Sequence, residues 1–487
     1  MNIAIVAAEM GPLAKAGGLA DVIGALPQAL KRAGAHPSVV LPAYRCVLDQ
    51  TETAVFAEGC ELALGNSVEP YRVLRVRADP DVPLYLIDHP GFFDRDGIYG
   101  DATGVYPDNH RRFVFFGRAA AALASQSLGP DVLHAHDWHG ATAAVVARAD
   151  PALRTRLAHT VSAFTIHNMA FQGHFASDEF ALLGLDSSWY SIANLEFFRR
   201  VNLMKGAIVL ADGVSTVSPS YANEVASDAE LGFGLDGVLR DKGDHFIGIL
   251  NGADYEEWDP AKDPQISTHY SAARRIGKKA CLYDLREELH LPHRLATPVI
   301  GMVTRMVWQK GVDLLAAALD RVLAIDIQLV MLASGDPALE QQFREAAQRY
   351  PDRLRIISGF DNRLAHRVQA GSDMFLMPSR YEPCGLTQMY ALKYGSAPIV
   401  RATGGLKDTV VEFDRAAGTG NGFLFADYAP DALVDAIARA TAVFQEPRQW
   451  ARLMQNCFAA DFSWDRAASA YLAWFDRLRA ERTATDG

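Results

Sequence analysis

The sequence is poor in cysteine and lacks long apolar runs. Its 487 residues contain five scattered cysteines, an odd number, and no Cys-x-x-Cys pair, so no disulfide framework is expected. No run of about 18 uninterrupted apolar residues occurs, which argues against a membrane span. The first residues lack the basic start of a signal peptide. These absences predict a soluble protein of the reducing cytoplasm.

The Gly-Gly loops lack the dinucleotide-binding signature, and the chain lacks the P-loop and serine-hydrolase signatures. The Gly-Gly loops of this chain do not read Gly-x-Gly-x-x-Gly, and there is no Gly-x-x-x-x-Gly-Lys-Ser/Thr and no Gly-x-Ser-x-Gly. This weighs against dinucleotide oxidoreductases, P-loop NTPases and serine hydrolases. The net charge of -11 argues against general binding to nucleic acid or to an anionic membrane. An anionic substrate would therefore need a local cluster of cations.

Apolar segments of strand type alternate with helical segments along the chain. This alternation predicts α/β domains built from βαβ units with mainly parallel sheets. The length exceeds what one hydrophobic core usually supports, so we expect one domain at 1–250 and a second at 251–460. The helix of the last segment, 461–487, carries three aromatic residues and is expected to pack on the first domain. The expected strands are Asn2–Ala8, Ser38–Leu41, Arg72–Val76, Pro83–Ile87, Val132–His134, Val161–Ile166, Val214–Val217, Phe246–Leu250, Val299–Thr304, Ile327–Leu332, Leu354–Ile357, Met374–Met377 and Pro398–Val400.

The stretch from Pro378 to Val410 has the features of a ligand-binding edge. Two apolar strands each end in a polar, glycine-containing turn that opens a helix, and such turns meet at the carboxyl edge of a parallel sheet. Three glycines are expected to clear space where a ligand touches backbone, and Glu382 is a fixed negative acceptor. The combination suits a sugar hydroxyl beside a diphosphate. The three glycines are Gly385, Gly404 and Gly405.

A Gly-Gly-Leu-x-Asp pattern occurs twice, once in each expected domain. It lies within Lys15-Ala-Gly-Gly-Leu-Ala-Asp21 and again within Ala402-Thr-Gly-Gly-Leu-Lys-Asp408. Each copy follows an apolar strand and opens a helix. We interpret the two as ligand loops facing each other across an interdomain cleft, with a chance echo as the alternative.

Two cations lie five residues apart just after the expected strand that ends at Thr304. Arg305 offers a planar fork for a phosphate and Lys310 a point charge. On a loop this close to the strand edge both can converge on one anion. The alternative is a pair of solvated surface charges.

A cluster of imidazoles follows another strand. His134, His136, Asp137 and His139 are plausible zinc ligands by type. Alternation along a strand end would divide their side chains between two faces, so separate structural and substrate roles are favoured. His167 ends a further strand, and a core histidine is the alternative there. Two Asp-x-Asp tripeptides, Asp79-Pro-Asp81 and Asp94-Arg-Asp96, have the form that holds a divalent cation with a nucleotide, but such tripeptides are common.

Taken together, seven motifs resemble the bacterial glycogen synthases and the related plant starch synthases. They occur in the family's order and span almost the whole chain, which makes the set specific. The motifs are Lys15-Ala-Gly-Gly-Leu-Ala-Asp-Val, His134-Ala-His-Asp-Trp-His, Thr165-Ile-His-Asn-Met-Ala-Phe-Gln-Gly, Leu250-Asn-Gly-Ala-Asp, Thr304-Arg-Met-Val-Trp-Gln-Lys-Gly, Ser379-Arg-Tyr-Glu-Pro-Cys-Gly-Leu-Thr-Gln and Ala402-Thr-Gly-Gly-Leu.

The resemblance implies a GT-B fold, two Rossmann-like domains with parallel sheets facing across a cleft. It implies transfer of glucose from ADP-glucose to the non-reducing end of an α-1,4-glucan, with retention of configuration and release of ADP. No metal and no pyridoxal phosphate would be needed, and neither nucleic acid nor membrane is an expected partner. UDP-glucose as donor, or a non-glucan acceptor, is the alternative. Further alternatives are a pyridoxal-dependent glucan phosphorylase and an inactive glucan-binding protein.

The resemblance also implies roles for particular residues. Catalytic roles fall on Asp137, His167, Arg305, Lys310 and Glu382. Donor contacts fall on Lys15, Gly18, Asp21, Asn251, Phe360, Cys384, Gly385, Leu386, Thr403, Gly404, Gly405 and Leu406.

The chain departs from the family pattern in two places. Ala16 replaces a usual threonine, and Tyr390 stands where related retaining transferases carry a second glutamate. With that glutamate absent, Phe360 is a candidate to stack on adenine. Tyr99, Tyr106, Phe92 and Phe93 are candidate glucan platforms, with core packing as the equal alternative.

Overall fold

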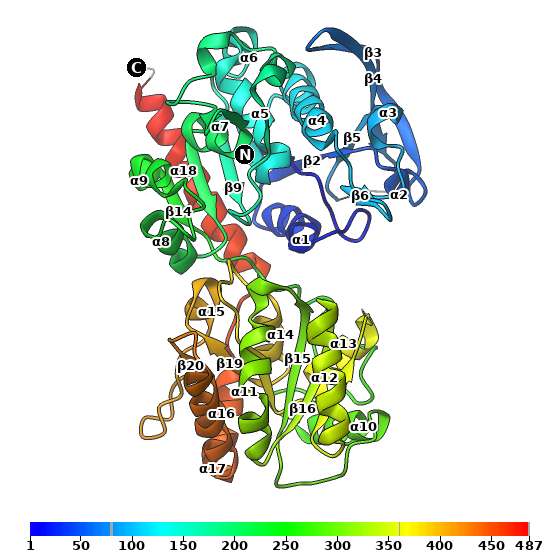
Figure 1. Cartoon of the computed structure of the whole chain (residues 1–487). Coiled ribbons are helices and arrows are strands. Elements are labelled where there is room, and N and C mark those ends of the chain that lie inside the picture. Colours follow the sequence, from blue (N-terminus) through cyan, green and yellow to red (C-terminus); the bar gives the residue numbers. More distant parts are fainter. Residues whose placement is uncertain (78–80, 360, 486–487) are drawn as a thin grey trace. The chain divides into compact units, whose positions relative to one another are not determined.

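The computed structural model describes the whole chain except residues 78–80, 360, 486 and 487. The chain forms two compact units (Figure 1). The first contains Met1–Gly252 together with Trp464–Gly487, and the second contains Ala253–Ser463. The expected boundary near Asn251 lies close to this division. None of the helices in the described ranges is long and apolar enough to cross a membrane.

The first unit is built on a nine-stranded sheet in the order β14-β13-β9-β8-β1-β2-β5-β4-β3. All neighbours from β14 to β5 are parallel, and only β4 and β3 at one edge run antiparallel. The strand order reverses beside β1, so the loops after β1 and β8 flank a topological switch point, where open α/β sheets bind ligands. The strands are β1 (Asn2–Val6), β2 (His36–Pro42), β3 (Thr53–Leu64), β4 (Ser67–Val76), β5 (Leu84–Asp88), β8 (Val132–His136), β9 (Val161–Ile166), β13 (Gly213–Thr216) and β14 (Phe246–Gly248).

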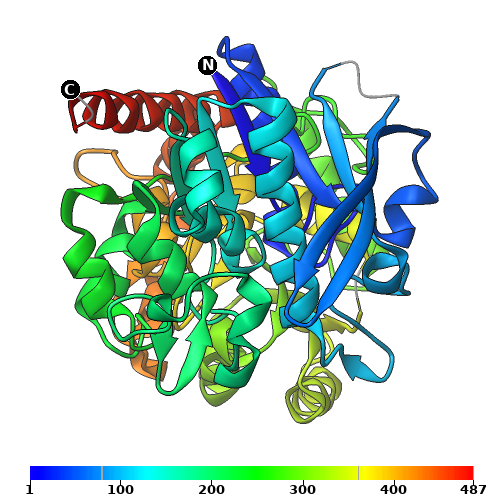
Figure 2. The ribbon, with the colours of Figure 1, turned by 90° about the horizontal axis from the view of Figure 1, so that it is seen from above.

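Helices cover both faces of this sheet (Figure 1). They are α1 (Gly18–Arg32), α2 (Arg45–Leu48), α3 (Pro90–Phe93), α4 (Asn109–Leu123), α5 (Asp137–Ala149), α6 (Pro151–Arg156), α7 (Leu203–Leu210), α8 (Pro219–Ser227), α9 (Asp236–Lys242) and the C-terminal α18 (Trp464–Thr485). The last of these packs against α1 and β9 and buries Tyr471, Trp474 and Phe475. Figure 2 shows α18 (red) as one straight segment beside the N-terminus. Its aromatic stripe explains why a segment so distant in sequence joins the first unit.

Small sheets lie outside the main sheet of the first unit. Three short strands form the order β10-β12-β11, namely β10 (His174–Ala176), β11 (Glu196–Phe197) and β12 (Arg200–Asn202). β6 (Gly100–Asp101) and β7 (Gly104–Val105) form a two-stranded ribbon. None of these strands was expected from the sequence, because two or three residues show no periodicity.

The second unit has six parallel strands in the order β17-β16-β15-β18-β19-β20. In chain order this is 3-2-1-4-5-6, the doubly wound arrangement of dinucleotide-binding folds, and its switch point lies between β15 and β18. The strands are almost continuous apolar runs because helices bury both faces. They are β15 (Val299–Met306), β16 (Gln328–Gly335), β17 (Leu354–Ile357), β18 (Met374–Met377), β19 (Ala397–Arg401) and β20 (Phe423–Phe425).

The helices of the second unit connect these strands. They are α10 (Ile276–Glu288), α11 (Val312–Ala324), α12 (Pro337–Arg349), α13 (Asn362–Gly371), α14 (Thr387–Lys393), α15 (Gly404–Thr409), α16 (Pro430–Phe444) and α17 (Pro447–Ala459). The first of them, α10, buries Cys281 and Leu285.

Candidate active site

The two loops at the switch point of the second unit carry an ion pair. Lys310 lies in a short 3₁₀ turn after β15, and Glu382 lies in the loop after β18. The Lys310 Nζ donates to Glu382 Oε2 at 2.6 Å, with the side chains 20% and 6% exposed. The sequence predicted Lys310 to face an anion together with Arg305. Instead the structure pairs it with the carboxylate predicted for the sugar.

Further contacts fix Glu382 in place. Ser379 Oγ donates to the same carboxylate oxygen at 3.1 Å, and the Gly405 N–H donates to the Glu382 carbonyl at 3.0 Å. Burial and these bonds leave the carboxylate little freedom, so a ligand would find it already oriented.

Arg305 differs from Lys310 in having no partner. It lies near the end of β15 and is exposed, and within the described residues its guanidinium makes no hydrogen bond or ion pair. The site therefore presents one unpaired cation beside a nearly buried ion pair. The Arg305 guanidinium offers the planar pair of N–H donors that suits a phosphate.

The glycines of the second unit first serve the packing of two loops. Gly404 has φ +44°, and a Cβ there would lie 2.0 Å from the Glu382 carbonyl oxygen. A Cβ on Gly405 would lie 2.1 Å from the Cys384 carbonyl oxygen, and one on Gly385 (φ +71°) would meet the Gln388 side chain at 2.4 Å. Packing of the two loops therefore already requires these glycines, and the expectation that they also clear space for a ligand stays a prediction.

The remaining donor candidates of this unit differ in access. Leu406 is fully buried in a core cluster with Val400 and Val410, so its side chain cannot contact a donor in this conformation. Cys384 and Thr403 are also buried, and Leu386 is partly exposed. Phe360 lies outside the described residues.

In the helix that opens at Gly404, two backbone N–H groups are bonded within the protein. It spans six residues. The Gly405 N–H donates to Glu382, and the Leu406 N–H donates to the Thr403 carbonyl at 3.1 Å. These two groups are already satisfied, so charge stabilisation at this edge falls to the side-chain cations.

Tyr390 is part of an aromatic stack, which explains a tyrosine where related enzymes carry glutamate. Its ring lies parallel to that of Trp258, with centroids 4.4 Å apart, and the other face of Trp258 stacks on His366 at 3.7 Å. His366 Nδ1 in turn pairs with the buried Asp263 at 2.8 Å. A glutamate at 390 would lose this stacking.

In the first unit, Glu9 organises the loop after β1. It is 4% exposed, and its Oε2 accepts from the N–H groups of Ala16 and Gly17 at 2.8 and 2.7 Å. The Tyr99 hydroxyl donates to Oε1 at 2.7 Å. Sequence reasoning missed Glu9. The signal available was a carboxylate placed directly after a buried strand and before the Gly-Gly loop.

The Gly-Gly loop of the first unit is open where that of the second unit is packed. Lys15 Nζ donates to Asp21 Oδ1 at 2.6 Å, and both side chains are exposed. A Cβ on Gly18 would meet no atom within 4 Å. Gly18 and Leu19 form the first turn of α1, whose N–H groups have no partner inside the helix. No packing reason in the described chain thus requires Gly18, which fits a role toward a ligand.

Asp137 lies at the carboxyl end of β8 in an unusual backbone conformation. Its φ is +51°, a region that residues other than glycine seldom adopt. Its Oδ1 accepts from the His167 N–H at 2.8 Å, which ties the ends of β8 and β9 together. Burial raises the pKa of Asp137 to about 7, an effect that the nearby Glu9 increases. Backbone strain and a raised pKa together mark a functional carboxyl.

His167 is a neutral imidazole held by a second one. Its Nε2 lies 2.9 Å from Nδ1 of the fully buried His136. Burial lowers the pKa of His167 to about 3, and burial with neighbouring imidazoles lowers that of His136 well below its ordinary value. Nε2 of His136 is buried without a partner among the described residues. A proton there would be an orphaned donor, so it lies on Nδ1 and is donated to His167, which leaves Nδ1–H of His167 for a ligand.

The other imidazoles have structural partners, and the metal alternative for this cluster is wrong. His134 Nε2 lies 2.7 Å from the Thr165 hydroxyl, and its ring lies among the aromatic residues of α18. His139 stacks on Tyr99 with centroids 4.6 Å apart. Within the described residues, no group of three or more His, Cys, Asp and Glu side chains could hold a metal ion. The absence of a metal requirement stays a prediction.

Of the two Asp-x-Asp tripeptides, the one at Asp94–Asp96 is occupied by an arginine. Asp94 and Asp96 both pair with Arg45, the former at 2.6 Å. Asp79 lies outside the described residues.

Two of the four candidate aromatic platforms belong to the core. Phe92 and Phe93 are buried, so core packing, the alternative, accounts for them. Tyr99 and Tyr106 are partly exposed, with the Tyr99 hydroxyl bonded to Glu9 and the Tyr106 ring against Arg95 and Arg112.

Asn251 ends the first unit with an unsatisfied polar atom. It is 5% exposed, and its Oδ1 has no hydrogen-bond partner in the described part of the chain. Asn251 is predicted to contact the sugar nucleotide. A buried hydrogen-bond acceptor without a partner at this residue fits such a contact.

The fold and the catalytic candidates define a glycosyltransferase of the GT-B class. Residues 2–241 match the family described as "Starch synthase catalytic domain", and residues 287–452 match "Glycosyl transferases group 1". The chain belongs to the family of bacterial glycogen synthases and plant starch synthases.

Individual relatives cover nearly the whole chain. Glycogen synthase of Anaeromyxobacter dehalogenans (strain 2CP-1 / ATCC BAA-258) is 44% identical, covering 99% of this chain and 100% of its own. Glycogen synthase 2 of Geobacter sulfurreducens is 42% identical, with 97% of each chain covered. The catalytic domain of starch synthase IV from Arabidopsis thaliana, solved with ADP and acarbose, has a TM-score of 0.88 at 35% identity, covering 98% of this chain and 99% of that one.

Proposed function

We propose that this enzyme transfers glucose from ADP-glucose to the non-reducing end of an α-1,4-glucan, retains the anomeric configuration and releases ADP. The observation that carries the proposal is the set of charges at the switch point of the second unit, an unpaired Arg305 beside the oriented Lys310–Glu382 pair. The relatives support it, because they are named glycogen synthases and the starch synthase structure was solved with ADP and acarbose.

Arg305 and Lys310 would act on the leaving group. Cleavage of the bond between glucose and the diphosphate leaves negative charge on the β-phosphate, and two adjacent cations would lower the free energy of that state. In the free enzyme Lys310 neutralises Glu382. A diphosphate would draw Lys310 toward itself and free Glu382 to accept from sugar hydroxyls. Removing one such preorganised donor costs about 10²–10³ in kcat.

His167 would orient the sugar. A pKa of about 3 makes it a weak base at neutral pH, so it would donate from Nδ1 to a sugar hydroxyl. The acceptor hydroxyl would then attack on the face from which ADP departs, and the departing phosphate would take its proton. Within this scheme no side chain needs to form a covalent intermediate.

Donor contacts in the first unit would come from its open loop. Lys15, Gly18 and Asp21 are exposed or partly exposed. The buried Oδ1 of Asn251 accepts no hydrogen bond from the described residues and could accept one from the substrate. We propose that these residues contact ADP-glucose, with no metal ion and no pyridoxal phosphate taking part.

The test offers ADP-glucose and UDP-glucose separately with glycogen, with and without a chelator, and follows nucleotide release. We expect ADP release that depends on glycogen and is unchanged by the chelator. Labelled glucose added to glycogen should be recovered as maltose by β-amylase, which requires α-1,4 linkages. Release of UDP from UDP-glucose with no release of ADP from ADP-glucose would contradict the proposed donor. Resistance of the product to β-amylase would contradict the α-1,4 linkage.

A further inference from the structure

The first unit exposes three phenylalanines that core packing does not explain. Phe171, Phe198 and Phe233 are 63%, 81% and 38% exposed. They come from three separate segments: the loop after β9, the turn between β11 and β12, and the segment before α9. We call these three residues the aromatic tract.

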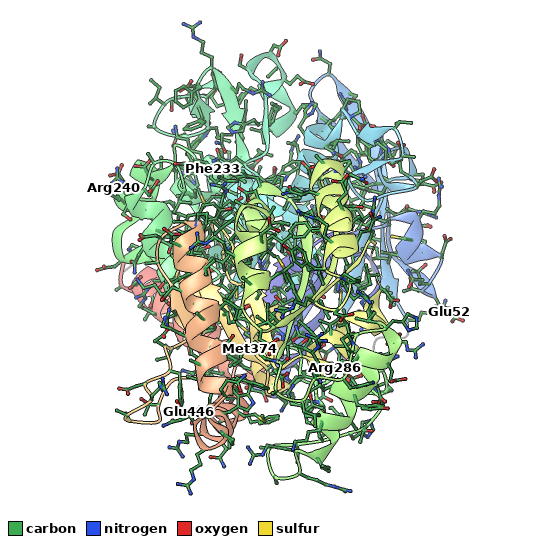
Figure 3. The ribbon with its side chains drawn as sticks, turned by 60° about the horizontal axis from the view of Figure 1, so that its bottom comes forward. Glu52, Phe233, Arg240, Arg286, Met374 and Glu446 are labelled. Atoms are coloured by element: carbon green, nitrogen blue, oxygen red, sulfur yellow. The ribbon has the colours of Figure 1, made fainter. Side chains whose placement is uncertain are left out.

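Contacts place the three segments that bear the tract next to one another. The Phe197 ring packs edge-on against Phe198 with centroids 4.6 Å apart, and a Cβ on Gly234, which follows Phe233, would lie 3.1 Å from the Phe197 ring. The Gln172 Nε2 donates to the Phe233 carbonyl at 3.2 Å, and Phe171 directly precedes Gln172. Figure 3 shows Phe233 just ahead of α9, the helix that bears Arg240. The segments that carry Phe171, Phe198 and Phe233 are therefore neighbours in the first unit.

Two members are held in a backbone conformation that opposes their residue type. Phe198 and Arg199 are the two turn residues between paired strands, with φ +49° and +62°, where asparagine and glycine are preferred. Phe233 has φ +49°. Glu196 Oε1 accepts from the Arg199 N–H at 2.7 Å and holds the turn. A bulky, solvent-exposed side chain at a strained position points to a function rather than to stability.

The tract begins next to the catalytic candidates of the same unit. The Phe171 N–H donates to the Asn168 carbonyl at 3.3 Å, and Asn168 directly follows His167. The tract thus leads from the predicted sugar site out to Phe198.

We propose that the aromatic tract binds an α-1,4-glucan chain beyond its reacting end, and this rests on the proposed function. An extended glucan is uncharged, and its sugar rings have apolar faces that stack on aromatic side chains, with hydroxyls at their edges. Exposed donors lie among the rings: Arg199 in the turn, and His174, which stacks on Phe197 with centroids 5.6 Å apart. A nucleotide diphosphate would need a cation cluster with a phosphate-sized cradle, so the neutral polymer is the better match.

The decisive variant is Phe198→Gly, because it separates binding from folding. Glycine suits φ +49°, so the unfolding temperature should stay the same or rise. Loss of the ring should raise KM for glycogen about three- to ten-fold, with kcat and KM for ADP-glucose unchanged. KM for maltotriose should not change, since a trisaccharide is too short to extend along the tract.

Two further variants complete the test. Phe171→Ala should raise KM for both acceptors, because Phe171 adjoins the His167 segment. Phe56→Ala is the matched control, an exposed phenylalanine (40%) on β3, and it should leave both values unchanged. Affinity electrophoresis in glycogen gels gives a readout independent of turnover, in which Phe198→Gly should migrate faster than the wild type.

The outcomes separate this inference from the proposed function. If the wild type transfers glucose and the two variants Phe198→Gly and Phe56→Ala have the same KM for glycogen, the tract does not bind glucan. The proposed function would still stand. Absence of transfer by the wild type would overturn the function, and gel retardation would still decide the tract. A loss of self-association in Phe198→Gly with unchanged glycogen retardation would assign the surface to contacts between copies of the chain and refute the proposal.

Discussion

Replacing Asp137 by asparagine should stabilise the protein and impair the enzyme. The pKa of Asp137 is raised to about 7 from an ordinary value of 3.8, chiefly by burial. Between these two values the folded chain keeps a proton that the unfolded chain has lost, so stability falls as pH rises through this window and stays low above it. Asparagine carries no charge, accepts the His167 N–H through the same oxygen and tolerates φ +51°.

The pKa difference sets the size of the effect. At about 1.4 kcal/mol per pH unit, the full difference corresponds to about 4 kcal/mol above pH 7. Asp137 is partly exposed, and solvent screening reduces this figure. We therefore expect Asp137→Asn to raise the free energy of unfolding by about 2–4 kcal/mol at pH 8, and by about half as much at pH 5.5.

Urea unfolding of wild type and variant at both pH values measures this difference. Tryptophan fluorescence follows unfolding of both units, because Trp138 and Trp474 belong to the first unit and Trp258 and Trp308 to the second. Glucose transfer by the variant should fall at least about ten-fold, the usual conflict between stability and a functional site. A variant that is less stable than the wild type, or a gain independent of pH, would refute the reasoning.

Substitutions at four other residues test three separate parts of the account. Lys310→Met should lower kcat about 10²–10³-fold while unfolding changes little, as steady-state kinetics and calorimetry would show, and unfolding of the variant would instead indicate a structural role. Gly404→Ala should destabilise the second unit by about 1–3 kcal/mol because its Cβ would lie 2.0 Å from a carbonyl oxygen. Gly18→Ala should raise KM for ADP-glucose without loss of stability. Equal stability of the two variants would contradict the packing argument. His136→Leu should lower kcat about ten-fold through loss of its hydrogen bond to His167. His136→Asn should retain more activity because its amide can donate in the same place. An equal loss in both variants would count against the assignment of the His136 proton to Nδ1.

The strands and the ligand edges of both units could be predicted from sequence. Buried parallel strands are short apolar runs, and those at Val161–Ile166 and Met374–Met377 have the predicted bounds. Because loops after parallel strands share one edge, the placement of Lys310 and Glu382 at the edge of a single sheet also followed from the pattern. Long amphipathic helices such as α18 were equally clear.

What the sequence could not provide was which groups bond to one another. The pairing of Lys310 with Glu382 depends on the spacing of two loops, 72 residues apart in sequence. Gly404 and Gly405 are required by carbonyls of a different loop, and motif position alone cannot distinguish that from contact with a ligand. Glu9 belongs to no motif, and its role appears only when its three hydrogen bonds are seen.

The most direct test of the central claim is a crystal structure of the protein with bound ADP. The account predicts that Arg305 and Lys310 both contact the β-phosphate, and that the 2.6 Å bond from Lys310 to Glu382 is lengthened or broken. ADP bound away from the carboxyl ends of β15 and β18, with that ion pair intact, would contradict it.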